Sequence, residues 1–147
     1  MNNERLDHLY QETILAHNKN PRNFKVPDTF THHSHGKNPL CGDDYHIYLN
    51  IKDGVIEDIG FHGQGCAISK ASSSILTTEV KGKRVEDVKR LKDEFLNMIT
   101  EKSQCDGDCQ NCLGKLKIFE GVKKYPVRVK CATLIWRALE DALEIQG

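Results

Sequence analysis

The chain has 147 residues, a length typical of one domain that buries its own hydrophobic core. Its 21 Lys and Arg residues balance 21 Asp and Glu residues, so no net field attracts nucleic acid or an anionic membrane. No apolar run reaches the roughly 18 residues of a membrane span, and the polar start is unlike a signal peptide. We therefore expect a cytoplasmic protein, a single domain over residues 1–147, and neither nucleic-acid nor membrane partners.

The first predicted element is an amphipathic helix from about residue 4 to 18. Its apolar residues recur at three- and four-residue steps, among them Leu6, Leu9, Tyr10 and Ile14. Pro21 ends this helix, and the next twenty residues are predicted to form an irregular connection. The connection contains three histidines, His32, His33 and His35. Because they lack a clear helical or strand spacing, we expect a solvated loop there in preference to a metal site.

A β-hairpin is predicted next. The alternating run from Tyr45 to Ile51 is joined by Asp53-Gly54 to a second alternating run from Val55 to Phe61. Cys41 precedes the first strand and Cys66 follows the second. Antiparallel pairing therefore brings these two cysteines to the same end of the sheet.

Cys66 follows a glycine turn, Gly63-Gln64-Gly65, and precedes a run of small residues with helical character. A cysteine at a helix N-terminus is favoured as the thiolate, which binds metal or attacks an electrophile. Taken alone, Cys66 would be better explained as a small buried residue. In a reducing cytosol, however, the chain's six cysteines favour metal ligands or reactive thiols over disulfides. Cys41, Asp43 and Cys66 together form a set of ligands that suits zinc.

The C-terminal half is predicted to contain two further helices. The first runs from Val85 to Ile99, and the second follows Pro126 and carries Cys131 on its apolar face, where spacing alone predicts only a packed residue. A loop between them carries Cys105, Cys109 and Cys112. Their CxxxCxxC spacing is that of radical enzymes that use S-adenosylmethionine, but 147 residues cannot also supply the barrel that such enzymes need. A second metal site and exposed redox-sensitive thiols both stay open.

Three motifs resemble the U-type iron-sulfur assembly proteins, the IscU and NifU N-terminal domain superfamily. They are Asn38-Pro39-Leu40-Cys41-Gly42-Asp43, Gly63-Gln64-Gly65-Cys66-Ala67-Ile68-Ser69 and Arg128-Val129-Lys130-Cys131-Ala132-Thr133-Leu134. The resemblance covers nearly the whole chain. It implies an α+β fold with a small antiparallel sheet of about three strands packed against four to five helices. The SufU branch is the most similar, because Lys130 stands where IscU proteins have His and an extra segment separates Ile99 from Tyr125.

The resemblance to SufU implies a zinc site made by Cys41, Asp43, Cys66 and Cys131. It also implies a sulfurtransferase that accepts persulfide sulfur from a SufS-type, pyridoxal-phosphate-dependent cysteine desulfurase, activates that enzyme, and serves downstream iron-sulfur assembly proteins. We expect Cys41 to be the acceptor, since it lies on a turn flanked by Pro and Gly. A desulfurase side chain would replace Cys41 on zinc and free its thiolate. Arg128 is either a contact for this partner or an ordinary surface residue.

Two other functions compete with sulfur transfer. A scaffold would hold a transient iron-sulfur cluster on the cysteines, but a protonated Lys130 offers no ligand where IscU proteins have His. A purely structural zinc domain would unfold when Cys41 is replaced by Ala. The triplet Cys105, Cys109 and Cys112 is not part of the SufU pattern, which leaves room for a second metal or a sulfur relay.

Overall fold

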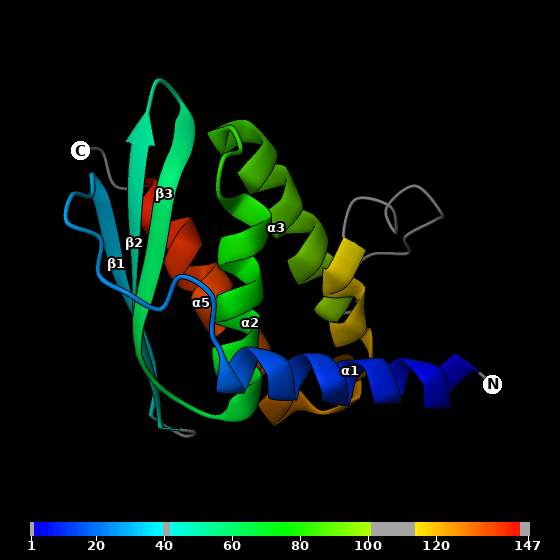
Figure 1. The fold of residues 1–147 in the computed structure, drawn as a ribbon. Coiled ribbons are helices and arrows are strands. Elements are labelled where there is room, and N and C mark those ends of the chain that lie inside the picture. Colours follow the sequence, from blue (N-terminus) through cyan, green and yellow to red (C-terminus); the bar gives the residue numbers. More distant parts are fainter. Residues whose placement is uncertain (1, 40–41, 101–113, 145–147) are drawn as a thin grey trace.

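The computed structural model describes residues 2–39, 42–100 and 114–144. It confirms the expected α+β fold, in which a three-stranded antiparallel sheet of order β1-β2-β3 packs against helices (Figure 1). The elements follow the chain in the order α1 (Asn2–Lys19), β1 (His32–Asn38), β2 (Asp43–Lys52), β3 (Val55–Gln64), α2 (Ala67–Val80), α3 (Val85–Ile99), the 3-10 helix η1 (Gly114–Lys124) and α5 (Pro126–Glu144). The expectation of a single domain over residues 1–147 stays a prediction.

The predicted hairpin is present, and it gives the sheet two different faces. Asp53 and Gly54 connect β2 to β3 with φ angles of 54° and 76°, the left-handed conformation that a tight hairpin turn requires. Along β2, alternate side chains from Asp43 to Leu49 are buried, while those between them are partly exposed. The buried face packs against the helices, and Asp44 and His46 lie on the opposite face.

The prediction of an irregular connection through residues 31–36 was wrong. Residues 32–38 form strand β1, which pairs antiparallel with β2 over its whole length. The strand contains three His and one each of Ser, Gly, Lys and Asn, and none of the β-branched or aromatic residues Val, Ile, Thr, Tyr, Phe and Trp that favour strands. Pairing with β2 therefore supplies the stabilisation that local propensity does not. At Gly36 the strand lies directly against α5, because a Cβ there would be 3.3 Å from Ala138 and Leu134.

Helices α2 and α5 cover the buried face of the sheet, and α3 and η1 form a further layer beyond them (Figure 1). Trp136 of α5 lies at the centre of this arrangement and is fully buried. Its ring stacks on Phe95 of α3 with centroids 4.5 Å apart, and its Nε1 donates a hydrogen bond to Ser72 Oγ of α2 at 3.1 Å. Burial of these aromatic rings supplies much of the hydrophobic stabilisation of the helical layers.

Helix α1 lies across one end of α2, as Figure 1 shows. His17 Nδ1 and Ser74 Oγ share a hydrogen bond of 2.6 Å, and Asn18 Nδ2 donates to the carbonyl of Ala67 at 2.8 Å. These contacts fix the C-terminal end of α1 beside the first and middle turns of α2. Among the described residues, no helix is both long enough and apolar enough to cross a membrane.

Candidate metal centre

Three elements bring potential metal ligands together at one end of the sheet. Asp43 begins β2, Cys66 directly precedes α2, and Cys131 lies in the second turn of α5. The carboxylate and the two sulfur atoms all lie within 4.8 Å of one another. Asp43 is only 1% exposed and Cys131 only 4% exposed, while Cys66 is partly exposed. The structure therefore places Cys131 beside the other two, which sequence spacing could not do.

The glycine turn allows the backbone to come close to this centre. Gly63 has a φ of 146°, and a Cβ at that position would lie 2.1 Å from the carbonyl oxygen of Asp44. A Cβ at Gly65 would lie 2.6 Å from Asp43 Oδ1 and 2.5 Å from Ser69 Oγ. All three distances are too short for real atoms, so the geometry of the centre needs glycine at both positions.

Cys66 caps the N-terminus of α2, as the sequence indicated. Its sulfur accepts a hydrogen bond from the backbone N–H of Ser69 at 3.4 Å, and its own backbone N–H donates to Asp43 Oδ1 at 2.9 Å. The unpaired N–H groups and the dipole at a helix N-terminus favour negative charge. The Cys66 sulfur is thus held at the helix start, within 4.8 Å of the Asp43 carboxylate.

The second carboxylate oxygen of Asp43 indicates what the centre can hold. Oδ2 is buried and accepts no hydrogen bond from any residue that the structure describes. A buried carboxylate oxygen without a partner is costly, and a cation is one way to compensate it. One carboxylate and two cysteine sulfurs match three of the four positions of a tetrahedral zinc site. The residues present thus fit a zinc ion, although metal binding by them stays a prediction.

Two tyrosines that the sequence did not identify as site residues lie beside the metal centre. Burial raises the pKa of Tyr45 to about 12, and negative charge on Asp43 and Cys66 acts in the same direction. Burial also raises the pKa of Tyr10, where Arg128 opposes the rise and Cys66 and Cys131 add to it. Both phenols stay protonated at neutral pH. Tyr45 could have been found from its place two residues after Asp43 on the same strand face, whereas the position of Tyr10 depends on how α1 packs.

The remaining predicted site residues are distributed as follows. Cys41, Cys105, Cys109 and Cys112 lie outside the described residues. Arg128 is exposed in the first turn of α5, where its guanidinium lies 4.7 Å from the centroid of the Tyr125 ring. Its role as a partner contact stays a prediction.

The chain matches the family described as the NifU-like N terminal domain over residues 9–132. It is 40% identical to the zinc-dependent sulfurtransferase SufU of Bacillus subtilis, over 96% of this chain and 93% of that protein. It is 36% identical to the iron-sulfur cluster assembly scaffold protein IscU of Streptococcus pyogenes, over 95% of this chain and 86% of that protein.

A solved structure has the same fold. It is the putative iron-sulfur cluster assembly scaffold protein for the SUF system from Fervidobacterium islandicum, which superposes with a TM-score of 0.85 at 33% identity. The alignment covers 93% of this chain and 98% of that one. The three-stranded sheet and its helical cover are therefore shared along nearly the full length of both chains.

Proposed function

Because this chain belongs to the family of the NifU-like N-terminal domain, we propose that it is a zinc-dependent sulfurtransferase for iron-sulfur cluster assembly. It accepts persulfide sulfur from a SufS-type cysteine desulfurase. The relatives named above include a zinc-dependent sulfurtransferase and an iron-sulfur cluster assembly scaffold protein. The named relative from Bacillus subtilis supports this choice, and so does the set of ligands on this chain.

One observation carries the proposal. A carboxylate oxygen of Asp43 lies within 4.8 Å of the sulfurs of Cys66 and Cys131, and the Oδ2 of this carboxylate is buried without a hydrogen-bond donor among the described residues. A bound zinc ion would neutralise this carboxylate and hold its cysteine ligands as thiolates. Cys41 is the candidate fourth ligand, because it precedes Asp43 by two residues and two residues of chain span at most about 7 Å.

The transfer step needs no redox partner. The thiolate of Cys41 attacks the outer sulfur of the desulfurase persulfide, and a new S–S bond forms between Cys41 and that sulfur. The S–S bond within the desulfurase persulfide breaks, and the desulfurase cysteine leaves as a thiolate. The proton count does not change, because one thiolate is consumed and one is released. Cys41 ends as the persulfide and can pass its outer sulfur to an assembly protein.

The surface next to the centre offers a place for the desulfurase to bind. Tyr125 and Val127 are 50% and 65% exposed, and the guanidinium of Arg128 lies over the Tyr125 ring. Arg128 precedes Cys131 by three residues, which is close to one helical turn. Tyr and Arg are among the residue types that contribute most at protein interfaces.

A cluster scaffold is the second candidate function, because relatives of similar identity are scaffold proteins. The side chains at the metal centre argue against a cluster scaffold. Iron-sulfur clusters are held mainly by four cysteines, whereas Asp43 contributes a carboxylate here. Lys130, the neighbour of Cys131, is exposed and has no acceptor atom to offer when protonated.

The test measures zinc content and sulfur transfer in the same preparations. Wild type should contain zinc, accelerate a SufS-type desulfurase, and gain the mass of one sulfur atom that a thiol reductant removes. Cys41→Ala should keep its fold by circular dichroism but lose both the acceleration and the added mass. Cys66→Ser should lose zinc.

Two outcomes would contradict sulfur transfer. Iron with labile sulfide in the wild type after anaerobic reconstitution, lost in Cys66→Ser and without acceleration of the desulfurase, would make the protein a scaffold. Unfolding of Cys41→Ala would make the zinc purely structural. Arg128→Ala serves as the probe of docking: it should raise the desulfurase concentration needed for half-maximal transfer while leaving the zinc content unchanged.

A further inference from the structure

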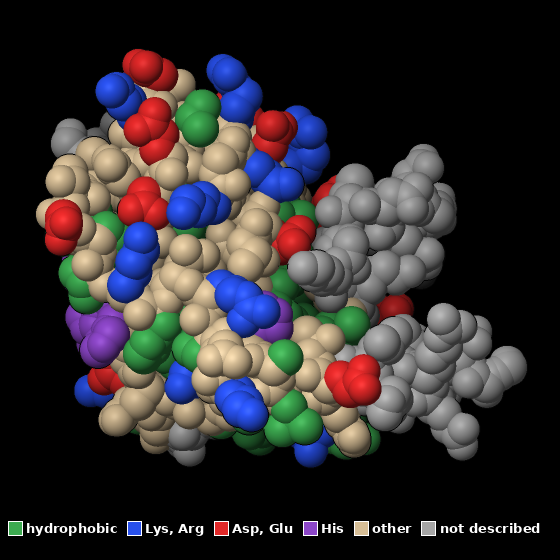
Figure 2. All heavy atoms as spheres, viewed as in Figure 1, with side chains coloured by type: hydrophobic (Ala, Val, Ile, Leu, Met, Phe, Trp, Pro, Cys, Tyr) green, Lys and Arg blue, Asp and Glu red, His purple; other side chains and the backbone are tan. Residues whose placement is uncertain are grey.

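The face of the sheet that points away from the helices carries a group of histidines. His33 and His35 lie on this face of β1, because their partners in β2 are Tyr48 and His46 of the partly exposed set. His46 is also opposite His62 of β3, so His35, His46 and His62 form one row across the three strands. Figure 2 shows histidine side chains gathered over the strands at the left of the view.

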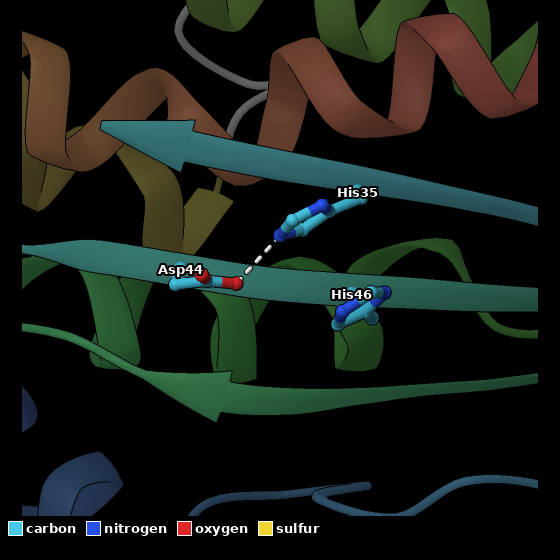
Figure 3. A group of neighbouring side chains, drawn as sticks. All are labelled: His35, Asp44 and His46. Atoms are coloured by element: carbon cyan, nitrogen blue, oxygen red, sulfur yellow. Dashed lines mark hydrogen bonds and ion pairs between the residues drawn. The ribbon is translucent and has the colours of Figure 1, made fainter. Parts of the chain in front are cut away.

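Within this group, three side chains from two strands converge. His35 Nε2 lies 2.6 Å from Asp44 Oδ1, and the rings of His35 and His46 stack with centroids 4.1 Å apart and an interplanar angle of 3°. One ligand atom from each of the three residues lies within 4.8 Å of the others. Figure 3 shows the three side chains on the same side of β1 and β2.

We propose that His35, Asp44 and His46 form a second metal site, which binds a divalent first-row transition-metal ion. Two imidazole nitrogens and one carboxylate oxygen are a ligand set for Zn²⁺, Fe²⁺, Co²⁺ and Ni²⁺, whereas Mg²⁺ and Ca²⁺ prefer oxygen ligands only. Water completes the coordination shell, because the side chains of His35 and Asp44 are 41% and 35% exposed.

The sheet holds these residues in a fixed relation before any ion arrives. His35 and His46 are directly opposite across two paired strands, where Cβ atoms lie about 5 Å apart. Asp44 and His46 are two residues apart on one strand, so their side chains point to the same face. Only side-chain rotation is needed for an ion to replace the contact between His35 and Asp44.

A fourth residue of the sheet, His33, holds one of the three candidate ligands in place. His33 Nε2 and His46 Nδ1 lie 2.8 Å apart and share a hydrogen bond. That bond orients the His46 ring and leaves its Nε2 for the ion.

The second site is separate from the first. Asp43 and Asp44 are consecutive in β2, so their side chains point to opposite faces of the sheet. Asp43 joins Cys66 and Cys131 on the buried face, and Asp44 joins the histidines on the other. The proposal of a second site therefore does not depend on whether the protein transfers sulfur.

Cobalt titration of the full chain, stripped of metal, distinguishes the two sites. Co²⁺ bound by thiolates gives a strong sulfur-to-metal charge-transfer absorption, and Co²⁺ bound by imidazole and carboxylate does not. We expect the wild type to bind one Co²⁺ ion that gives no charge-transfer absorption, in addition to any Co²⁺ ion that thiolates hold. Asp44→Asn and His46→Ala should weaken that ion's binding by about tenfold or more while leaving the charge-transfer absorption unchanged.

Matched variants make the experiment decisive. His32→Ala removes a histidine from the same strand but from the opposite face, and it should bind both kinds of ion as the wild type does. Cys66→Ser should lose charge-transfer absorption and keep the other ion. The proposal is overturned if the wild type binds no Co²⁺ without thiolate absorption, which would leave His35 and Asp44 as an ordinary ion pair. It is equally overturned if His32→Ala weakens binding as much as His46→Ala does.

Discussion

At the scale of the residue, Gly65 decides how closely the candidate ligands approach one another. It is followed by Cys66, and a Cβ added to it would lie 2.6 Å from Asp43 Oδ1 and 2.5 Å from Ser69 Oγ, which leaves no room for a methyl group. The backbone angle of Gly65 is not in the left-handed region, so the requirement for glycine is steric and not conformational. Any side chain there has to displace the carboxylate of Asp43, which also accepts the hydrogen bond from Cys66.

Replacement of Gly65 by Ala should weaken zinc binding and destabilise the fold by about 1–3 kcal/mol, as an extra methyl group does in a tightly packed site. A competition titration with a chromogenic chelator measures the affinity for zinc, and urea unfolding measures the stability. Gly121→Ala is the matched control, because a Cβ at Gly121 meets nothing within 4 Å. If Gly65→Ala bound zinc as tightly as Gly121→Ala, Asp43 would not be a ligand in its present position.

At the scale of the element, the packing of α2 against α5 holds Cys66 beside Cys131. Ser72 of α2 lies at this contact and is fully buried. Its Oγ donates a hydrogen bond to the carbonyl of Ala132 at 2.6 Å and accepts one from Trp136 Nε1 at 3.1 Å. Because Cys131 precedes Ala132 directly, this pair of bonds fixes the part of α5 that carries the ligand.

Ser72→Ala should therefore destabilise the protein by about 1–3 kcal/mol, since the indole N–H of Trp136 would be left buried without a partner. Ser73→Ala is the control on the next residue of the same helix. Ser73 is equally buried, but among the described residues its hydroxyl donates only to the carbonyl of Ser69 in its own helix, so its loss should be nearly neutral. Equal effects of the two changes in urea unfolding would contradict the assigned role of Ser72.

At the scale of the whole molecule, the candidate zinc ligands tie three parts of the fold together. Asp43 belongs to the sheet, Cys66 to the start of α2, and Cys131 to α5 near the end of the chain. The unfolded chain does not hold these groups together, so a metal ion bound by all three stabilises the folded state selectively. Metal content should accordingly determine the thermal stability of the protein.

Removal of zinc by a strong chelator should lower the melting temperature. Binding at about 1,000 times the dissociation constant contributes about 4 kcal/mol, and in a chain of this size that corresponds to about 10 °C. Differential scanning calorimetry measures the shift and should show one cooperative transition, as the single-domain prediction requires. Asp44→Asn should retain the shift, whereas Cys66→Ser should melt at the same temperature with or without the chelator. A chelator-independent melting temperature in the wild type would exclude zinc from this centre.

The sequence by itself determined the local elements. Asp53-Gly54 between alternating runs predicted the β2–β3 hairpin, and the glycine turn before Cys66 predicted a cysteine at a helix start. Hydrophobic periodicity and turn residues are local properties, so these elements can be predicted without knowing what packs against them. The motifs around Cys41, Cys66 and Cys131 also identified the family and, through it, the α+β fold.

Only the tertiary structure decided which of these elements meet. Strand β1 forms because β2 is beside it, although its own composition favours a loop, and that pairing alone aligns His35 with His46. Cys131 reaches Asp43 and Cys66 through the packing of α5 on the sheet and on α2, over a separation in the chain that no spacing rule covers. Strand pairing and helix packing depend on groups that are distant in sequence, so the energies that select them are not encoded in any one segment.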